Sequence, residues 1–465
     1  MNAKIKDEQL FAVIAFMAGI LLIFLIPPMC SPDENSHYIN AYSLARGIFF
    51  PTVSSDGYMG RMLPQSLIDF VETYNHKFAG HLDVQYTFAE AHQNLTASES
   101  FGNLAFYDYW NADLNLLAYL PSGFAIFLYL QISKLLPSLI LSNGNLLLVG
   151  RFGNLIFFIT AMYFAIKRTP YKKSTLLMAL LPMSIALAST LSYDTVVISM
   201  TALLFARLSD LLQSDRRVCT ADIAVFAVRS FFLFNVKMVY AAFLLCLFAV
   251  PIRRFIDRKQ YARSIVIVGA SGLLPFLLFR VLFRLLVNKK RWYYYSFLHQ
   301  QSLFLRGHLF SFCLTILHSF RQYASFYFLS FVGDLGQLDY LLPVSLCLLL
   351  CFILLLVVII DYGQKPVGFL LKGANLVALL ICLYLTFAGT YIIWTSHEVG
   401  IGVNYVSGVQ GRYFIPLIPS AGIILANGRL KNKEALTVFR DRISLIFIAL
   451  SVTYTVMFTF LRYWV

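Results

Sequence analysis

The feature of this sequence that most restricts its fold is a succession of apolar runs, most of them long enough to cross a lipid bilayer. A spanning helix needs about 20 mostly apolar residues in a row. Of the 465 residues, 59% are hydrophobic and 13% are charged, which excludes a soluble globular protein. The pattern predicts an all-α polytopic membrane protein with about eleven to thirteen transmembrane helices. The apolar runs are 9–29, 114–136, 145–166, 174–190, 194–213, 221–235, 238–252, 264–287, 308–331, 341–361, 368–394, 412–427 and 443–463.

Basic residues between these runs predict the orientation of the chain. They cluster in short connections, and such connections stay in the cytoplasm. This rule places the N-terminus inside and the long loop 30–113 outside, together with loops 288–307 and 396–411. The clusters explain the net charge of +14 without nucleic acid as a partner. The first run has no small-residue cleavage site, so we predict an anchor and not a removed signal peptide. The basic clusters are Lys167-Arg168 with Lys172-Lys173, Arg216-Arg217, Arg253-Arg254 with Arg258-Lys259, and 429–433 with Arg440 and Arg442.

Three stretches depart from this simple topology. The runs 114–136 and 145–166 both lie between the outer loop and the basic loop 167–173, although the charges require an odd number of crossings. We therefore predict that one of these two runs is only partly inserted. The runs 221–235 and 238–252 are short and break around Lys237, which is tolerated where a helix faces protein or a wet cavity. The cluster 289–291 is basic although it lies in an outer loop, and contact with phosphate is one explanation.

Directly after the first apolar run comes an acidic segment, Ser31-Pro32-Asp33-Glu34-Asn35-Ser36-His37-Tyr38. Its order suggests a helix from 32 to 46 with an N-terminal capping box, in which Ser31 is the cap and Glu34 reaches back to the helix start. Asp33 is then free for chemistry, and Glu34→Gln should be a mild change. Asp33, His37 and Asn40 share one face of this helix. The alternative is a capped interfacial helix with a solvated face.

Other polar residues also interrupt apolar surroundings. Asp194 lies at the outer end of a run, where the alternative to a functional role is an N-cap. Lys237 stands at the break between two short helices and Arg151 opens an apolar run; snorkelling to the membrane surface explains either of them as well as function does. Arg412 follows Gly408-Val409-Gln410-Gly411 and suits two-pronged binding of a phosphate. No nucleotide-binding or zinc-binding motif is present in the sequence.

These motifs, in this order, resemble a known family. The sequence is similar to the uncharacterised bacterial multi-pass proteins of the GT-C glycosyltransferase superfamily, and the resemblance covers nearly the whole chain. It therefore predicts one GT-C-like transmembrane domain, 1–465, that contains the first extracytoplasmic loop, 30–113, with amphipathic helices at 62–76 and 83–95. Gln337 departs from the pattern, because tryptophan is expected there. The motifs are Pro32-Asp33-Glu34 with His37, Tyr119-Leu120-Pro121, Gly150-Arg151, Leu181-Pro182-Met183, Ser192-Tyr193-Asp194, Gly333 to Asp339, and Gly408 to Tyr413.

The resemblance implies a function. It predicts a glycosyltransferase of the bacterial cytoplasmic membrane that takes a sugar from a polyprenyl-phosphate donor and passes it, with inversion, to a glycan or lipid-linked acceptor on the outer face. Asp33 maps onto the superfamily's general base. The resemblance leaves a divalent metal open as a cofactor. The alternatives are a transporter or flippase, or a polymerase, for lipid-linked polysaccharide. The supporting residues are Glu34, His37 and Asp194 for orienting the acceptor, and Arg412, Lys237 and Arg151 for binding the donor phosphate.

Overall fold

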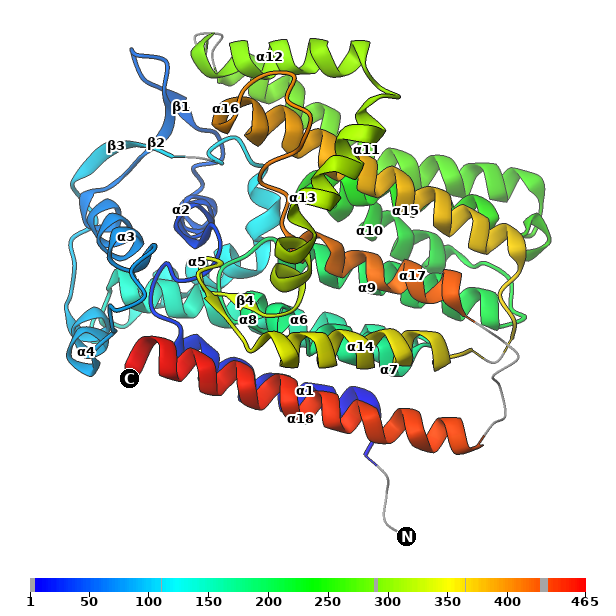
Figure 1. Ribbon diagram of the computed structural model, residues 1–465. Helices are drawn as coiled ribbons and strands as arrows, with labels where there is room; N and C mark the ends of the chain where they lie inside the picture. The colour runs from blue at the N-terminus through cyan, green and yellow to red at the C-terminus, as the bar shows by residue number, and fades with distance from the viewer. Residues whose placement is uncertain (1–4, 110, 288–291, 364, 427–433) are drawn as a thin grey trace.

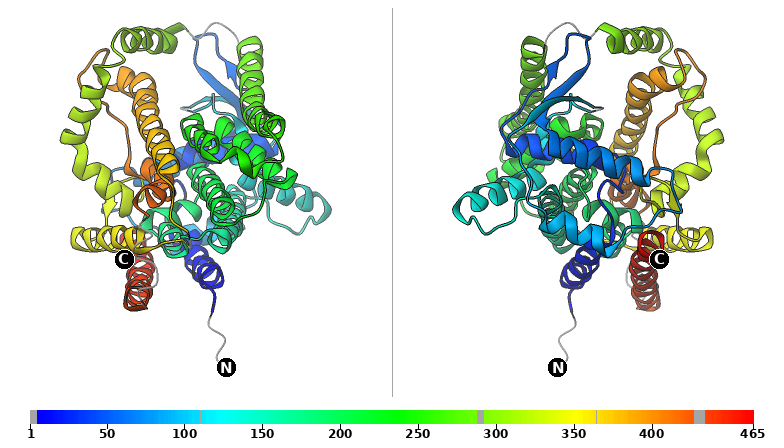
Figure 2. Two further views of the ribbon diagram at one scale, coloured as in Figure 1. Left: turned by 90° about the vertical axis from the view of Figure 1, so that its right-hand side faces the viewer. Right: turned by 90° about the vertical axis from the view of Figure 1, so that its left-hand side faces the viewer.

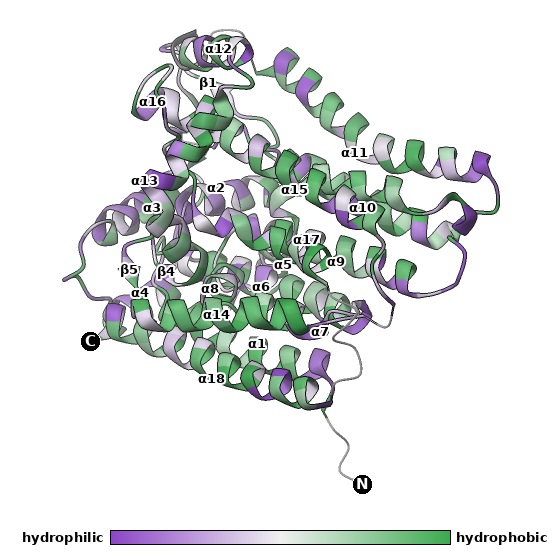
Figure 3. Cartoon of the chain, turned by 45° about the vertical axis from the view of Figure 1, so that its right-hand side comes forward, coloured by the Kyte–Doolittle hydropathy of each residue, from purple (hydrophilic) through white to green (hydrophobic). Residues whose placement is uncertain are grey.

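The helices of this protein lie side by side with their axes roughly aligned, so that the molecule has two distinct ends (Figure 1). The computed structural model describes residues 5–109, 111–287, 292–363, 365–426 and 434–465. We call the end that carries residues 30–113 the loop end, and the opposite end, where the N-terminus and α7 lie, the basic end. Figure 3 shows hydrophobic residues along the middle of the long helices and hydrophilic residues toward both ends. This distribution is typical of a multi-pass membrane protein.

Eight helical segments in the described part of the chain are long and apolar enough to cross a membrane. They pass the length of about 20 residues that a bilayer requires. The eight segments are α1 (Asp7–Leu25), η1 with α5 (Leu116–Tyr119, Leu120–Leu135), α6 (Asn143–Arg168), α9 (Asp194–Gln213), α10 with η2 (Thr220–Lys237, Met238–Ala249), α11 (Arg258–Leu286), α15 with η4 and α16 (Phe369–Thr390, Tyr391–Thr395, Ser396–Glu398), and α18 (Glu434–Trp464).

Shorter or bent helices fill the rest of the bundle. α12 and α13 would make a ninth span if counted together, but they are bent by 111° at their junction. The polytopic helical membrane fold is confirmed, whereas the predicted number of eleven to thirteen crossings stays a prediction. The shorter helices are α7 (Lys172–Ala179), α8 (Pro182–Ala188), η3 (Ile252–Arg254), α12 (Trp292–Gly307), α13 (Phe312–Val332), α14 (Val344–Ile360), η5 (Gly411–Leu417) and α17 (Ile418–Leu425).

Although length and composition place α10 with η2 among the eight candidate segments, these two helices form a hairpin and not one continuous span. The residues just outside the hairpin meet, because the Val218 amide donates to the Arg254 carbonyl at 2.8 Å. α10 ends at Lys237, whose backbone leaves the helical region (φ −150°, ψ 88°) before η2 starts. The chain thus runs from the basic end to Lys237 and back, and the break falls where the sequence predicts it.

Helix α5 begins and ends beside residues 30–113. At its start, the Tyr119 hydroxyl accepts a hydrogen bond from Asn40 of α2. Beyond its end, the Leu141 carbonyl accepts from the Glu99 amide at 3.0 Å. Because both ends contact residues 30–113, we infer that α5 does not reach the basic end and that α6 alone does. This arrangement provides the odd number of crossings that the basic loops require.

Residues 30–113 form helices around a small antiparallel sheet of strand order β1-β2-β3. The helices α3 and α4 correspond to the predicted amphipathic helices, although each starts a few residues later than predicted. The sequence does not predict these short strands, but the chain as a whole is mostly helical and agrees with the predicted all-α class. A second small sheet pairs β4 with β5. The elements are α2 (Glu34–Ala45), β1 (Thr52–Val53), β2 (Met59–Pro64), α3 (Gln65–Phe78), α4 (Phe88–Thr96), β3 (Leu104–Asp108), β4 (Asp334–Leu335) and β5 (Tyr340–Leu341).

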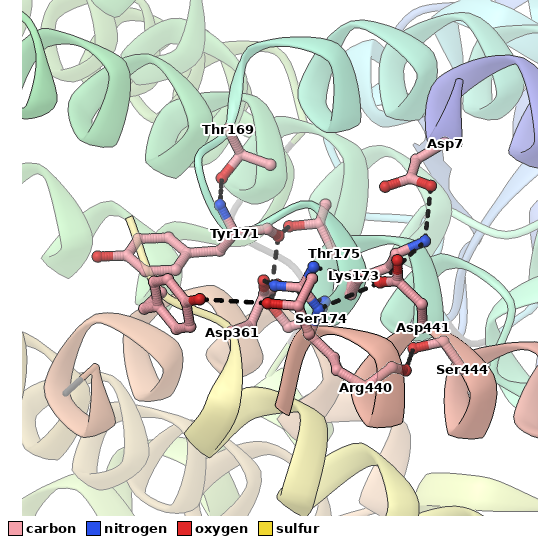
Figure 4. A network of polar contacts seen from close by, with 12 residues as sticks. Asp7, Thr169, Tyr171, Lys173, Ser174, Thr175, Asp361, Arg440, Asp441 and Ser444 are labelled. Carbon is pink, nitrogen blue, oxygen red and sulfur yellow. Dashed lines mark hydrogen bonds and ion pairs between the residues drawn. The ribbon is translucent and has the colours of Figure 1, made fainter. Parts of the chain in front are cut away.

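A polar network joins four helices at the basic end (Figure 4). The Asp361 carboxylate, just after α14, accepts hydrogen bonds from the Ser174 amide (2.9 Å) and hydroxyl (3.0 Å) at the start of α7. Arg440 of α18 donates to the other Asp361 oxygen at 3.2 Å, and Lys173 pairs with Asp7 of α1 at 2.7 Å. Each of these charged groups contacts a protein partner, so this network has a structural role.

Candidate functional site

Asp33 ends the turn that leads from α1 into α2. It adopts a left-handed backbone conformation (φ 60°), and α2 begins at the next residue, Glu34. The predicted capping box is wrong, because Asp33 and not Ser31 is the cap position and no side chain caps the helix. The Ser31 hydroxyl instead accepts a hydrogen bond from Thr190 at 2.9 Å. A non-glycine residue held in this conformation stores backbone strain, which is found most often at functional sites.

Four charged side chains form an alternating chain at the loop end. The Asp33 carboxylate lies 2.8 Å from Nη2 of Arg412 at the start of η5. The Arg412 Nε lies 3.3 Å from Asp194, the first residue of α9. The other Asp194 oxygen lies 3.3 Å from Nζ of Lys237 at the α10–η2 break. Two carboxylates and two cations therefore balance, and residues predicted as base, orienting carboxylate and phosphate ligands meet in one place.

Aromatic rings surround the ammonium group of Lys237. Its Nζ lies 3.5 Å from the centroid of the Tyr413 ring and 5.3 Å from that of Tyr193. A cation over a ring face is attracted by the ring's quadrupole, and the attraction is larger when water is excluded. The aromatic contacts hold the ammonium group in place. Its three N–H donors are only partly used, because among the described residues Lys237 forms one ion pair, at 3.3 Å.

His37 and Asn40 lie on the face of α2 that the sequence predicts for them. The His37 Nδ1 is 2.8 Å from the Tyr119 hydroxyl, and Asn40 Nδ2 donates to the same oxygen at 3.4 Å. On its other side, Asn40 Oδ1 accepts from Nη1 of the buried Arg61 at 2.9 Å. Burial lowers the pKa of His37 to about 4, although the nearby Asp33 carboxylate opposes this shift. His37 is therefore neutral at physiological pH.

Arg151 does not join the charged chain. Its Nε and Nη2 contact the two oxygens of Glu34 at 2.8 and 2.7 Å, and its remaining donors reach the carbonyls of Ile23, Ile26 and Pro27 at the end of α1. Both side chains of this ion pair are at most 1% exposed. Because every donor of Arg151 is occupied, its contacts favour a structural role. Arg151 pairs with Glu34 and not with Asp33. Glu34 also accepts from the Leu191 amide at 3.0 Å.

Gln337 supports the turn that leads to Asp33. It lies in the β4–β5 hairpin, and its Nε2 donates to the Met29 carbonyl at 2.6 Å. The hairpin is held in turn by Asp339, whose carboxylate accepts from the Gln337 amide at 2.9 Å and lies 3.6 Å from Arg462. The motif 333–339 thus forms a hairpin that supports the turn before Asp33.

A large cavity adjoins the charged chain. Its volume is about 960 Å³, and its lining includes Val236 and Met238, the two neighbours of Lys237. Its lining combines polar residues, among them Asp108, Asn111 and Asn115, with the aromatic residues Phe276, Phe279 and Phe283 of α11. Figure 2 shows the β1–β2 hairpin, α11, α12 and α16 around this region. Polar groups beside apolar walls are typical of a site for an amphipathic ligand.

The structure does not decide on a metal. Among the described residues, no three His, Cys, Asp or Glu side chains lie together in a way that could hold a metal ion. The divalent metal therefore stays a prediction. The basic cluster 289–291, named above as a candidate phosphate contact, falls within 288–291, outside the described residues.

The comparison with known families now bears on the identity of the chain. A family model described as a predicted membrane protein, DUF2142, matches residues 16–421. The chain belongs to the DUF2142 family. Every residue of the charged chain and of the Glu34–Arg151 pair falls inside the matched part. No curated protein matches this DUF2142 chain. Family membership agrees with a multi-pass membrane protein, and the relationship to GT-C enzymes stays part of the proposal below.

Arg61 is the functional-site residue of this DUF2142 protein that the sequence analysis missed. It stands alone in the strand Met59–Pro64, in a segment where only helices are predicted. Its one available signal was an arginine between apolar residues, Met59-Gly60-Arg61-Met62-Leu63. The tyrosines Tyr119, Tyr193 and Tyr413 are part of the quoted motifs, but their contacts with His37 and Lys237 require the folded chain.

Proposed function

We propose that this DUF2142 protein is a glycosyltransferase that moves a sugar from a polyprenyl-phosphate donor to a glycan or lipid-linked acceptor, on the outer face of the bacterial cytoplasmic membrane. The observation that carries the proposal is the alternating chain Asp33–Arg412–Asp194–Lys237 beside a cavity whose lining holds both polar and apolar side chains. Such a cavity suits a molecule with a sugar at one end and an isoprenoid at the other.

The proposed reaction uses Asp33 as the base. The acceptor hydroxyl oxygen attacks the anomeric carbon and its proton passes to Asp33, while the bond from the anomeric carbon to the phosphate oxygen breaks and its electron pair stays on the phosphate. Attack opposite the leaving group inverts the anomeric centre. Asp33 is the one member of the charged chain whose side chain is well exposed, at 43%, against 1% for Arg412 and 6% for Asp194. A base must reach the proton that it removes.

Arg412 and Lys237 supply the positive charge that the leaving phosphate needs. Cations preorganised where negative charge develops lower the barrier without reorganisation. In the resting site Arg412 is paired with Asp33, so the guanidinium occupies this carboxylate. A donor phosphate that takes over Arg412 would release Asp33 at the moment when a base is required. Asp194, buried between both cations, keeps them in place during this exchange.

The test uses the full chain purified into nanodiscs. We expect it to release polyprenyl phosphate and to label a glycan or lipid acceptor when given a panel of polyprenyl-phosphate sugars and a bacterial envelope extract. Asp33→Asn should abolish the reaction, whereas Asp69→Asn, on the exposed face of α3, should not. No release and no labelled product from any donor would overturn the proposal. Movement of intact sugar-lipid between leaflets would point to the transporter or flippase alternative, and a polymerised lipid-linked glycan to the polymerase alternative.

A further inference from the structure

A buried line of hydrogen bonds ends beside Asp33 and is not used by the proposed reaction. It runs from Arg61 on β2 through Asn40 on α2 and Tyr119 on η1 to His37 on α2. All four side chains are at most 2% exposed. Buried polar networks of this kind specify one arrangement of donors and acceptors, because any mismatch leaves a polar group unsatisfied.

Arg61 determines which way the Asn40 amide faces. A guanidinium has only donors, so the group 2.9 Å from Arg61 Nη1 must be the Asn40 oxygen. The Tyr109 hydroxyl donates to the same oxygen at 2.6 Å. The opposite side of the amide gives an independent check, because the Asn111 carbonyl, which can only accept, lies 3.3 Å from the Asn40 nitrogen.

Asn40 in turn determines the direction of the Tyr119 hydroxyl. The Asn40 nitrogen donates to the Tyr119 oxygen at 3.4 Å, so that oxygen acts as an acceptor on this side. Its own proton needs an acceptor, and among the described residues His37 Nδ1, at 2.8 Å, is the acceptor within hydrogen-bond distance. Nδ1 must then be the unprotonated nitrogen of a neutral ring, and the ring proton sits on Nε2.

We propose that His37 is held as the neutral Nε2–H tautomer and that this N–H donates a hydrogen bond to a sugar oxygen beside Asp33. Within the described part of the chain Nε2 makes no hydrogen bond to protein, so it is the open end of the line. The ring is held edge-on against Tyr193, with centroids 5.0 Å apart. Arg61, Asn40 and Tyr119 are positioning residues that act through His37. The sugar contact rests on the proposed function, whereas the tautomer does not.

The first test is spectroscopic. The full chain with ¹⁵N-labelled histidine, in nanodiscs near neutral pH, should give a His37 signal with a protonated Nε2 and an unprotonated Nδ1; the signal is assigned by its loss in His37→Gln. In Asn40→Asp the ring proton should move to Nδ1. The new carboxylate accepts the proton of the Tyr119 hydroxyl, so the phenol oxygen is left to accept a hydrogen bond from Nδ1. Tyr119→Phe should give a mixture of tautomers. A protonated Nδ1 or a mixture in the unmodified protein would overturn the proposal.

The second test uses two substitutions that place an N–H at different points of the ring. The amide nitrogen of His37→Gln lies near the position of Nε2, and that of His37→Asn near Nδ1. We expect His37→Gln to transfer sugar about tenfold faster than His37→Asn, the difference that one neutral hydrogen bond accounts for. The difference should appear in kcat/KM while the thermal unfolding midpoints of the two variants agree. Equal rates would remove the sugar contact. If no donor is turned over at all, the proposed function fails, but the tautomer is still decided by the spectra.

Discussion

Asp33 and Arg412 lie 379 residues apart in the chain and form an ion pair of 2.8 Å in which the arginine is buried and the aspartate is partly exposed. The asymmetry separates their roles. The buried guanidinium of Arg412 is fixed in position and can hold an anion. The Asp33 carboxylate, which is 43% exposed, can move away from Arg412 when another anion takes its place. The pair therefore has the form of a resting contact that an anionic ligand can displace.

The first prediction concerns Arg412→Lys. Lysine keeps the charge but loses the planar, two-pronged geometry that spans Asp33 and Asp194 and that would grip a phosphate. We expect the variant to accumulate in the membrane, to bind polyprenyl phosphate at least about tenfold more weakly, and to transfer sugar more slowly in proportion. Binding of polyprenyl phosphate to the purified protein is the measurement. Arg442→Lys, on the exposed face of α18 toward the basic end, is the matched control, and equal binding by the two variants would remove Arg412 from the phosphate site.

The second prediction separates two adjacent carboxylates. Asp33→Asn should reduce transfer by about 10² to 10⁴-fold with little change in thermal stability, because a general base is lost while the buried Arg412 keeps Asp194 as its anion. Glu34→Gln should instead lower thermal stability strongly and change the transfer rate little. It leaves the buried Arg151 without its anion, and loss of one partner of a buried pair costs about 3–5 kcal/mol. This reverses the mild effect that the capping-box interpretation predicts.

The measurements for this comparison are the thermal unfolding midpoint and the initial rate of each variant. A Glu34→Gln protein as stable as the unmodified one would show that the Glu34–Arg151 pair does not hold the turn. A rate near normal in Asp33→Asn would remove Asp33 as the base, whatever the stability of the variant.

The third prediction is a pH dependence of stability. Burial lowers the pKa of His37 from 6.5 to about 4, so between these values the unfolded chain binds a proton that the folded chain does not. Stability should therefore fall as the pH falls from about 6.5 toward 4, and the His37 term should be constant above that window. The unfolding midpoint of His37→Gln should be less sensitive to pH over the same range. Parallel midpoint curves for both proteins would contradict the burial of a neutral ring.

The fourth prediction concerns α5. Because both its ends contact residues 30–113, cysteines at Ser138 and Ser98 should react with an impermeant thiol reagent from the same side of the membrane, in a background without the seven native cysteines. A cysteine at Asp215, whose side chain is 86% exposed at the basic end, should react only from the other side and serves as the control. Labelling of Ser138→Cys together with Asp215→Cys would make α5 a full crossing.

The sequence predicted those site residues that stand at the ends of helices. Asp33, Asp194, Lys237 and Arg412 each interrupt or border an apolar run, where a charge is costly and therefore noticeable. The same signal marks Arg151, and the sequence could not tell a phosphate ligand from an internal ion pair, because Glu34 and Arg151 are 117 residues apart and meet only by packing. Arg61 gave no comparable signal, since it lies in a short strand whose pairing with β3 depends on contacts across the whole outer segment.

The separation of Asp33 and Arg412 along the chain also sets the order in which the site can form during biosynthesis. At a translation rate of about 5–20 residues per second, the 379 residues between them take roughly 20–75 s to leave the ribosome. Asp194 and then Lys237 are made during this interval, so until η5 follows, Lys237 is the one cation made among the four members of the group, against two carboxylates. A chain that ends before residue 412 therefore cannot balance the charges of this group, because Arg412 is the residue that contacts both carboxylates.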